Sequence, residues 1–342
     1  MEFLWAALTR NFDHLLNVFF RVGSDFSINS LLCALAVAVA FVVWQRLRRG
    51  RRLRLRALAR ALFPRRILRS PSTVADIGYF LFNIFVFGAI VSFVAISYQF
   101  LTNGVLNGLI ALFGKPAPST WPEWASRSVI TVMLFLAYEF GYWVDHYLKH
   151  RVPFLWEVHK VHHTAEVLTP LTVFRMHPLD TYVFGNILAI VAAVTNGVGA
   201  YMFGDTTYQY ALSGSNIILV VFVHAYVHLQ HTHMWIAFRG LLGRIFLSPA
   251  HHQVHHSANP IHFNKNLGSC LAIWDWLFGT LHLPSKTPEK LTFGVEPAQA
   301  NAHTITGEFI APFGRAIMAL LAMIPGLPRR APDLAAAETE QS

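Results

Sequence analysis

Apolar runs close to the length of a bilayer crossing recur along this chain of 342 residues. A membrane-spanning helix needs about 20 consecutive, mostly apolar residues. Five segments come near this length: Ile28–Trp44, Ile77–Ser97, Val129–Val144, Tyr182–Phe203 and Tyr208–Val227. The apolar run Val105–Phe113 is too short to span and is interpreted as a re-entrant or interfacial turn. The pattern therefore predicts an all-α integral membrane protein with about four to five transmembrane helices.

Composition agrees with a membrane protein, because 54% of the residues are apolar and only 13% are charged. The net charge of +9 raises the alternative of nucleic-acid binding, but the positions of the charges argue against it. Eleven arginines lie between Arg46 and Arg69, with no acidic residue from Phe26 to Ala75, directly after an apolar run. This pattern is typical of a cytoplasmic loop beside a membrane span, in contact with anionic lipid headgroups. Docking of an acidic electron carrier is the alternative role, and no nucleic-acid partner is expected.

This basic loop predicts the topology of the whole chain. If it is cytoplasmic, the N-terminus is outside, the third span runs inward to Asp145 and His146, and the last two spans form a hairpin. Residues 146–180, and those after about His228, then lie on the cytoplasmic side. No signal peptide is expected, because the arginines follow the first apolar run. The predicted regions are an N-terminal span and basic loop (1–72), a catalytic domain (73–284), and an interfacial helix with a polar tail (285–342).

Histidines concentrate where two of the predicted spans reach the cytoplasmic side. Fifteen of the 18 histidines lie in the windows His146–His177 and His224–His262. Residues three and four apart share one face of a helix, and three such sets occur, in DHYLKH, HKVHH and HHQVHH. They supply eight imidazoles, which exceed the needs of one metal ion and predict a dimetal site in a cytoplasmic helical cap. A zinc site or a metal transporter is the alternative, although transporters carry ionisable residues within their spans.

The chain shows no electron-transfer cofactor motif of its own. It has only two cysteines, Cys33 and Cys270, so neither a disulfide framework nor an iron–sulfur cluster is expected. A GxGxxG loop and a haem-binding module are also absent from the sequence. If the site performs redox chemistry, an external donor is therefore expected, such as a ferredoxin or a cytochrome with its reductase.

The order of these motifs resembles the fatty acid hydroxylase and sterol desaturase superfamily. The resemblance covers roughly Thr73–Pro284 and includes HxxxH, HKVHH, RMHPLD, HTHMW, SPAHHQVHHS and NLGSCLAIWDWLFGT. It implies a membrane-bound non-haem di-iron oxygenase facing the cytoplasm, which uses O2 and outside electrons to hydroxylate or desaturate lipids. The metal ligands that it implies are His146, His150, His159, His162, His163, His252, His255 and His256, with His231 as the additional ligand upstream of the last box.

Other polar residues near these motifs are candidates for ligation or for hydrogen bonds to the ligands. His224, His228 and His233 are alternatives to His231 as the additional ligand, and His177 and His251 are candidates to support the ligands. The carboxylates Asp145, Glu157, Asp180 and Asp275 are candidates to accept the second ring N–H of a ligating histidine. For Asp275, capping of the WDWLFGT turn is an equal alternative.

The functional prediction combines the histidine pattern with the resemblance. We expect an oxidoreductase with two iron ions and O2 as co-substrate, which hydroxylates a C–H bond of an acyl chain, alkyl chain or sterol-like membrane lipid. Desaturation at the same site is the first alternative, because both reactions begin with hydrogen abstraction. A non-redox membrane protein that binds zinc or another metal is the second alternative.

Overall fold

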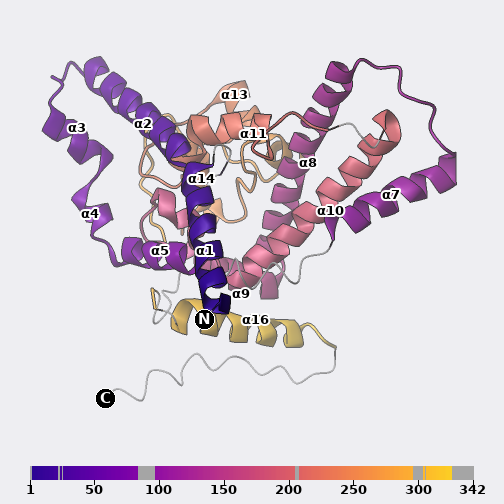
Figure 1. Cartoon of the computed structure of the whole chain (residues 1–342). Helices are drawn as coiled ribbons and strands as arrows, with labels where there is room; N and C mark the ends of the chain where they lie inside the picture. Colours follow the sequence, from indigo (N-terminus) through magenta and orange to yellow (C-terminus); the bar gives the residue numbers. More distant parts are fainter. Residues whose placement is uncertain are drawn as a thin grey trace.

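The computed structural model describes residues 2–21, 24, 26–83, 97–204, 208–295, 303–304 and 306–325. Over these residues the chain is mostly helical (Figure 1). Three of the described helices are long and apolar enough to cross a membrane: α2 (Ile28–Arg48), α8 (Glu123–Arg151) and α10 (Pro178–Phe203). They coincide with the first, third and fourth predicted spans, so the structure is consistent with the predicted helical membrane protein.

Helix α10 lies between α8 and α7 (Tyr98–Phe113) and packs closely on both (Figure 1). Two glycines make this approach possible, because a side chain at either position would collide with a neighbouring helix. A Cβ on Gly197 would lie 2.7 Å from the Cβ of Val105 on α7, and a Cβ on Gly199 would lie 2.4 Å from Cδ1 of Ile130 on α8. The start of α8 and the last turns of α10 are thereby held side by side.

Two predicted segments near the middle of the chain differ from the structure or lie partly outside it. The expected turn at Val105–Phe113 is the second half of α7, whose first turn is capped by Ser97 and which ends at Gly114. Gly114 has a φ of 81°, which favours glycine and stops the helix. The predicted span Ile77–Ser97 begins in α5 (Pro71–Phe82), and most of its remainder lies outside the described residues.

The predicted span Tyr208–Val227 is wrong before Ile217. A short antiparallel hairpin occupies this part, formed by β1 (Ala211–Leu212) and β2 (Ser215–Asn216). Ser213 and Gly214 have φ values of 52° and 87°, so a tight turn with two left-handed residues replaces a helix. The helical part consists of α11 (Ile217–Phe222), a π-helical stretch (Val223–Val227) and α12 (His228–Gln230). Apolar composition alone does not distinguish such a hairpin from a helix.

Helix α2 lies along the rest of the protein over its whole length. Near its start, Oγ of Ser30 is 2.9 Å from Nε2 of His228, and Ala34, Ala38 and Val42 pack against Leu229 and Met234. The predicted topology placed Ser30 at the outer end of a span and His228 on the cytoplasmic side. The structure instead brings these two residues into contact. The hydropathy pattern predicts which segments are long and apolar enough to span a membrane. It does not predict which surface of such a helix packs against the rest of the protein.

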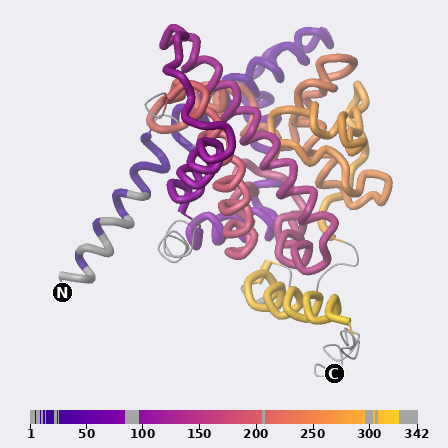
Figure 2. Tube along the Cα trace, turned by 90° about the vertical axis from the view of Figure 1, so that its right-hand side faces the viewer, coloured from indigo at the N-terminus to yellow at the C-terminus, as the bar shows by residue number. Residues whose placement is uncertain are grey.

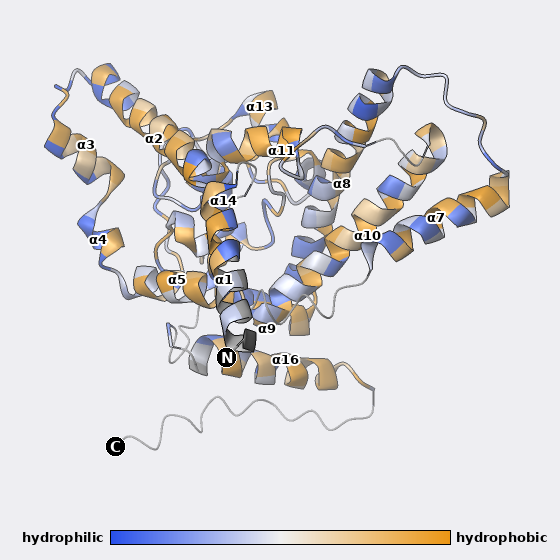
Figure 3. Cartoon of the chain, viewed as in Figure 1, coloured by the Kyte–Doolittle hydropathy of each residue, from blue (hydrophilic) through white to orange (hydrophobic). Residues whose placement is uncertain are grey.

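The basic segment after α2 folds back on the same side of the molecule. It contains α3 (Leu55–Leu62) and α4 (Arg65–Leu68) and leads into α5. Leu58, Ala61 and Leu62 of α3 pack against α2, while the arginines of this segment stay largely exposed. Helix α1 (Glu2–Phe20) precedes α2. Figure 3 shows mostly hydrophobic residues along α2.

Short helices build the central part of the molecule. They are α9 (Pro153–His163), α13 (Gly240–Ile245), α14 (Pro249–His255), α15 (Ile273–Leu277) and the 3-10 turns Pro170–Phe174 and Pro260–His262. A π-helical turn (Thr306–Ile310) leads into α16 (Ala311–Ala322), which packs on α9 at one end of the molecule (Figures 1 and 2). Nε of Arg315 donates to Oε2 of Glu157 at 2.8 Å, which fixes α16 to α9.

Candidate metal centre

The first two histidine motifs come from helices that follow each other directly. Helix α8 carries His146 and His150, one turn apart, and ends at Val152. Pro153 then opens α9, whose last turns carry the trio His159, His162 and His163. Proline suits the first helical position because the N–H it lacks would have no partner there. The sharp change of direction between α8 and α9 points both sets of imidazoles into one region.

The third motif lies on α14. Ser248 caps this helix, and the side chain of His251 closes a capping box with the backbone of Ser248. The trio His252, His255 and His256 then projects from the last turn, and all three side chains are buried. His231, at the C-terminal end of α12, meets this trio from the other side, with its Nε2 2.8 Å from Nε2 of His252.

The nine implied ligands form two groups. In each group, one ligand atom of every histidine lies within 4.8 Å of the others. The five-histidine group contains His146, His150, His159, His163 and His255. The four-histidine group contains His162, His231, His252 and His256. Each trio is therefore divided between the groups, and the two groups are adjacent because His162 and His163, like His255 and His256, are neighbours in the chain.

Hydrogen bonding does not explain these arrangements. In the five-histidine group every Nε2 atom is buried and has no partner among the described residues. In the four-histidine group Nε2 of His231 lies 2.8 to 3.2 Å from three other Nε2 atoms. One ring nitrogen carries at most one hydrogen and cannot donate to three neighbours. Buried polar atoms normally have a partner, so both groups fit a bound cation.

The opposite ring nitrogen orients several of these imidazoles. Nδ1 lies 2.8 Å from the carbonyl oxygen of Leu267 in His146, 3.2 Å from that of Arg175 in His162, and 2.9 Å from that of Lys265 in His255. A carbonyl oxygen only accepts, so Nδ1 carries the proton in each of these rings. The lone pair of Nε2 is then directed into the metal group.

Asp180 is the carboxylate that supports a ligand directly. Its Oδ2 lies 2.7 Å from Nδ1 of His159, and its Oδ1 accepts from Nζ of Lys149 at 2.6 Å. Lys149 also pairs with Asp145 at 2.6 Å, and all three charged side chains are buried. Asp145 therefore acts through Lys149, not on a histidine, and Glu157 pairs with Lys160 and Arg315 instead.

Asp275 fixes the loop at Leu267 and Gly268 and, within the predicted WDWLFGT turn, binds Thr280, so it anchors this turn to the preceding loop. Its carboxylate accepts from the backbone N–H groups of Leu267 and Gly268 at 2.8 and 2.9 Å, and from the hydroxyl of Thr280. These bonds fix the backbone whose Leu267 carbonyl faces His146. Asp275 thus reaches the site through one intervening residue.

The remaining histidine candidates lie outside both groups. Nε2 of His177 faces the carbonyl oxygen of Phe309 at 2.9 Å, while its Nδ1 caps α10. His228 contacts Ser30, and Nε2 of His233 faces the carbonyl oxygen of Ala61 at 2.7 Å. Nδ1 of His224 faces the carbonyl oxygen of Val220, and His251 caps α14. Among the four alternatives for the additional ligand, the structure brings only His231 into a metal group.

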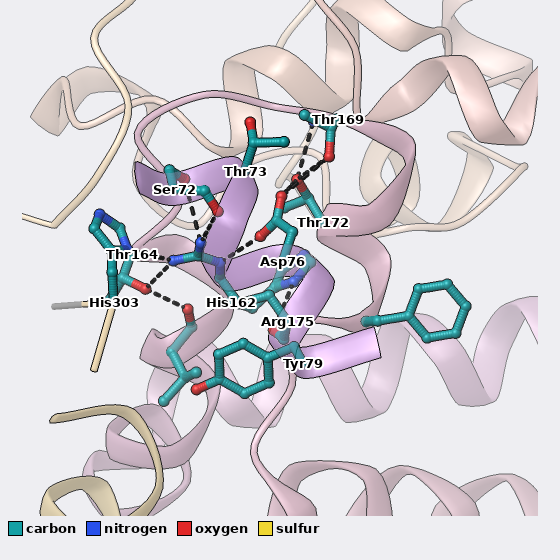
Figure 4. Close-up of polar contacts among 12 residues, drawn as sticks. Ser72, Thr73, Asp76, Tyr79, His162, Thr164, Thr169, Thr172, Arg175 and His303 are labelled. Atoms are coloured by element: carbon teal, nitrogen blue, oxygen red, sulfur yellow. Dashed lines mark hydrogen bonds and ion pairs between the residues drawn. The ribbon is translucent and has the colours of Figure 1, made fainter. Parts of the chain in front are cut away.

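Arg175 is buried beside the site and holds several segments together. The sequence analysis included it in the motif RMHPLD but assigned it no role. Figure 4 shows its guanidinium between Asp76 and Thr164. Nε donates to Oδ1 of Asp76 at 2.7 Å, Nη1 to Oε1 of Glu308 at 3.2 Å, and Nη2 to the carbonyl oxygen of Ser72 at 2.6 Å. Its own carbonyl oxygen accepts from His162. The network ties α5, α9 and the turn before α16 to one ligand.

Glu139 is a second functional candidate that the sequence analysis missed. It is fully buried on α8, and its Oε2 accepts from the backbone N–H groups of Cys270 and Leu271 at 2.9 and 2.8 Å. It therefore anchors the same loop that Asp275 organises. A lone glutamate inside an apolar run was the available signal, since buried carboxylates persist only with partners.

Burial sets the protonation state of the ligands. It is the main cause that lowers the pKa of His231 and His255 from the usual 6.5 to about 3. The pKa values of His162, His163, His252 and His256 are also well below their ordinary value, for the same reason. These imidazoles are therefore neutral at pH 7, which is the form that binds metal ions.

Comparisons with known proteins agree with this geometry. Residues 131–280 match the family model named fatty acid hydroxylase, and this range contains all nine histidines. The chain is 29% identical to the Homo sapiens alkylglycerol monooxygenase over 187 residues, covering 54% of this chain and 35% of that protein. It is 29% identical to ornithine lipid hydroxylase OlsE of Rhizobium tropici over 212 residues, covering 60% and 58% of the two chains.

A third relative is a Delta(7)-sterol 5(6)-desaturase of Gibberella zeae, 28% identical over 162 residues, covering 47% of this chain and 44% of that protein. The chain thus spans less than two thirds of the length of each of these relatives. No solved structure matches the chain significantly. The family match over residues 131–280 and these relatives support the resemblance to the fatty acid hydroxylase and sterol desaturase superfamily.

Proposed function

We propose that this protein is a membrane-bound non-haem di-iron oxygenase that hydroxylates a C–H bond of a lipid. The observation that carries the proposal is the convergence of nine imidazoles into two adjacent groups whose buried Nε2 atoms have no adequate hydrogen-bond partners. Imidazole is a common ligand of iron, and each group offers enough nitrogens for one ion. When bound, two iron ions would supply the O2 activation that oxidation of an unactivated C–H bond requires.

The chain's own residues would prepare the site in two ways. The carbonyl oxygens of Leu267, Arg175 and Lys265 hold three ligands in the tautomer that directs Nε2 inward. Asp180 accepts a hydrogen bond from His159 and adds negative charge next to a cationic centre otherwise built from neutral ligands. Such supporting groups raise ligand basicity and fix ring orientation. Burial of the ligands keeps bulk water from them.

A lipid substrate is supported by the position of the site as well as by the relatives. Helices α8 and α10 are candidate membrane spans, and their adjacent ends carry His146 and Asp180. The hydrocarbon chain of a lipid embedded beside these helices would therefore reach the metals from the bilayer. The relatives named alkylglycerol monooxygenase and ornithine lipid hydroxylase favour insertion of oxygen. The sterol desaturase relative keeps desaturation as the alternative outcome at the same site.

The electron donor and the orientation complete the proposal. We infer a separate ferredoxin or cytochrome with its reductase, because the sequence shows no nucleotide, haem or iron–sulfur motif. The site is proposed to face the cytoplasm, where such donors are available. The arginines between Arg46 and Arg69 support this side through the positive-inside rule.

The decisive experiment supplies labelled oxygen to the purified, iron-loaded protein. With a competent reductant, a lipid extract and ¹⁸O2, we expect a lipid product heavier by one labelled oxygen atom. A product that lacks two hydrogens would instead identify a desaturase. Equal product formation without O2, or no O2 consumption with any lipid fraction and donor, would contradict the oxygenase proposal. The non-redox zinc alternative would then become the leading explanation.

A further inference from the structure

A third cluster of metal-ligand side chains lies outside the two histidine groups. It contains His262, His282 and Glu289, and one ligand atom of each lies within 4.8 Å of the others. His262 ends the 3-10 turn that follows the third histidine motif. His282 and Glu289 belong to the segment 281–290, which follows the WDWLFGT turn. The cluster therefore joins two stretches of chain that lack regular helix.

The separation of two of these side chains fits a shared ion better than a direct bond. Nε2 of His262 lies 3.8 Å from Oε2 of Glu289, which is too long for a hydrogen bond. Two ligands bound tetrahedrally to one zinc ion, each at about 2.0–2.2 Å, are about 3.3–3.6 Å apart. A movement of a few tenths of an ångström would thus let both atoms bind one ion. The rings of His262 and His282 have centroids 4.9 Å apart.

Burial and hydrogen bonding also favour a ligand at this position. His262 is only 3% exposed, so an ion at its Nε2, the ring nitrogen that faces Glu289, would be shielded from water on the His262 side. The other oxygen of Glu289, Oε1, accepts a hydrogen bond from the backbone N–H of Ser285 at 2.9 Å. This bond orients the carboxylate so that Oε2 faces His262. His282 and Glu289 are half-buried, so one side of the cluster remains open to water.

The backbone around the cluster is fixed before any ion binds. The Asn266 side chain accepts from the backbone N–H of His282 at 2.8 Å and donates to the carbonyl oxygens of His282 and His251 at 3.0 Å. Asn259 caps the turn that ends at His262. Because these bonds already hold two of the ligands near α14, little conformational entropy would be lost on binding.

We propose that His262, His282 and Glu289 bind one zinc ion, with water as the fourth ligand. Two imidazoles and a carboxylate form a donor set typical of zinc, whereas calcium and magnesium prefer oxygen ligands alone. The ion would fasten the segment 281–290 to the chain that leaves α14. In that segment the carbonyl oxygen of Ser285 accepts from Nε1 of Trp235, which packs on Ala250 and Val254 of α14. The zinc ion would thus support the third histidine motif from outside.

Zinc content and local protease resistance test the proposal without any assay of lipid oxidation. The full-length protein in detergent is equilibrated with buffered zinc, and zinc and iron are counted by mass spectrometry. Glu289→Gln keeps the size of the side chain but removes its charge, and His262→Ala removes a ligand. Each variant is expected to hold one zinc ion fewer than the wild type. His224→Ala is the matched control, because His224 lies outside every metal-ligand cluster of the described residues, and it should retain the wild-type zinc content.

Trypsin cleavage at Lys286 and Lys290, both exposed, gives a readout of this segment when the peptides released from it are identified by mass. At free zinc about 100 times the dissociation constant, cleavage at these lysines should slow by about 100-fold in the wild type and the control, but not in Glu289→Gln. His231→Ala should disturb the four-histidine group and leave this protection intact. Equal zinc content and equal cleavage rates in wild type and Glu289→Gln would overturn the proposal. Neither outcome depends on the identity or the activity of the two-metal centre.

Discussion

The imidazoles of His162 and His163 belong to different metal groups although the residues are neighbours in the chain. Their ring centroids lie 5.6 Å apart and their planes are at 89°. His162 turns toward His231, whereas His163 turns toward His150 and His255. The same division separates His255 from His256 on α14. Two adjacent residues in each trio thereby connect the two proposed metal positions rigidly.

The assignment of His231 predicts a contrast with its near neighbour. His231→Ala should lose one of the two iron ions and most of the hydroxylating activity, because its Nε2 meets three ligand nitrogens. His233→Ala should retain both ions, because His233 faces only the carbonyl oxygen of Ala61. Iron content per chain and initial rates of product formation measure the difference. Equal iron loss in both variants would show that His231 is not a ligand.

The hydrogen bond from His159 to Asp180 predicts a graded effect. Asp180→Asn keeps the size of the side chain but removes the charge that orients His159 and pairs with Lys149. Loss of such a partner typically costs about 10- to 100-fold in metal affinity or activity. We expect this reduction in iron affinity, measured by competition with a chelator. An affinity unchanged from the wild type would contradict a role of Asp180 in positioning the ligand.

The buried position of Arg175 predicts a large loss of stability. Arg175→Leu leaves Asp76 and Glu308 buried without their cation, and breaking such a pair costs about 3–5 kcal/mol. Arg315→Leu is the control, because Arg315 and Glu157 are partly exposed and such a pair is worth about 1 kcal/mol or less. Unfolding of both variants in detergent should show this order. A similar loss in the two variants would be evidence against Arg175 as a structural hub.

The low pKa values of the ligands predict that the metal-free protein is sensitive to acid. The pKa of His231 and His255 is about 3 in the folded chain and near 6.5 in the unfolded chain. Below pH 6.5 the unfolded state binds more protons, so stability falls as the pH falls from 6.5 toward 3 and is greatest above this range. Each such histidine lowers the folding equilibrium constant by about tenfold per pH unit. Unfolding midpoints of the metal-free protein between pH 7.5 and 5 measure this decrease.

The contact of the basic segment with the catalytic region predicts a shared side of the membrane. Arg46, Arg49 and Arg51 line a cavity of about 250 Å³ together with Trp235 and Pro288. Single cysteines at Arg52 and Lys286, both exposed, should therefore react with an impermeant maleimide from the same side. A background with Cys33→Ser removes the exposed native thiol. Labelling from opposite sides would contradict both this prediction and the proposed topology.

The sequence alone determined the membrane character and the ligands that helical spacing brings together. Histidines three and four apart share a face wherever a helix forms, so the pair of the first motif and the trios of the other two follow from local geometry. Long apolar runs predicted α2, α8 and α10 for a similar reason, because length and composition are properties of one segment. Both predictions depend on the residues of a single segment, and the sequence shows these residues directly.

Only the tertiary structure decided which of the clustered histidines meet and what holds them. His231 is separated from His162 by 69 positions, and Arg175 from Asp76 by 99, so no local spacing selects them over His228, His233 or another buried cation. The same holds for Glu139, which reaches Cys270 across 131 positions. The apolar pattern also did not predict the hairpin at Ala211–Asn216, because its turn depends on the backbone conformations of Ser213 and Gly214. Contacts between distant segments depend on how whole helices pack, and hydropathy along the chain does not record that packing.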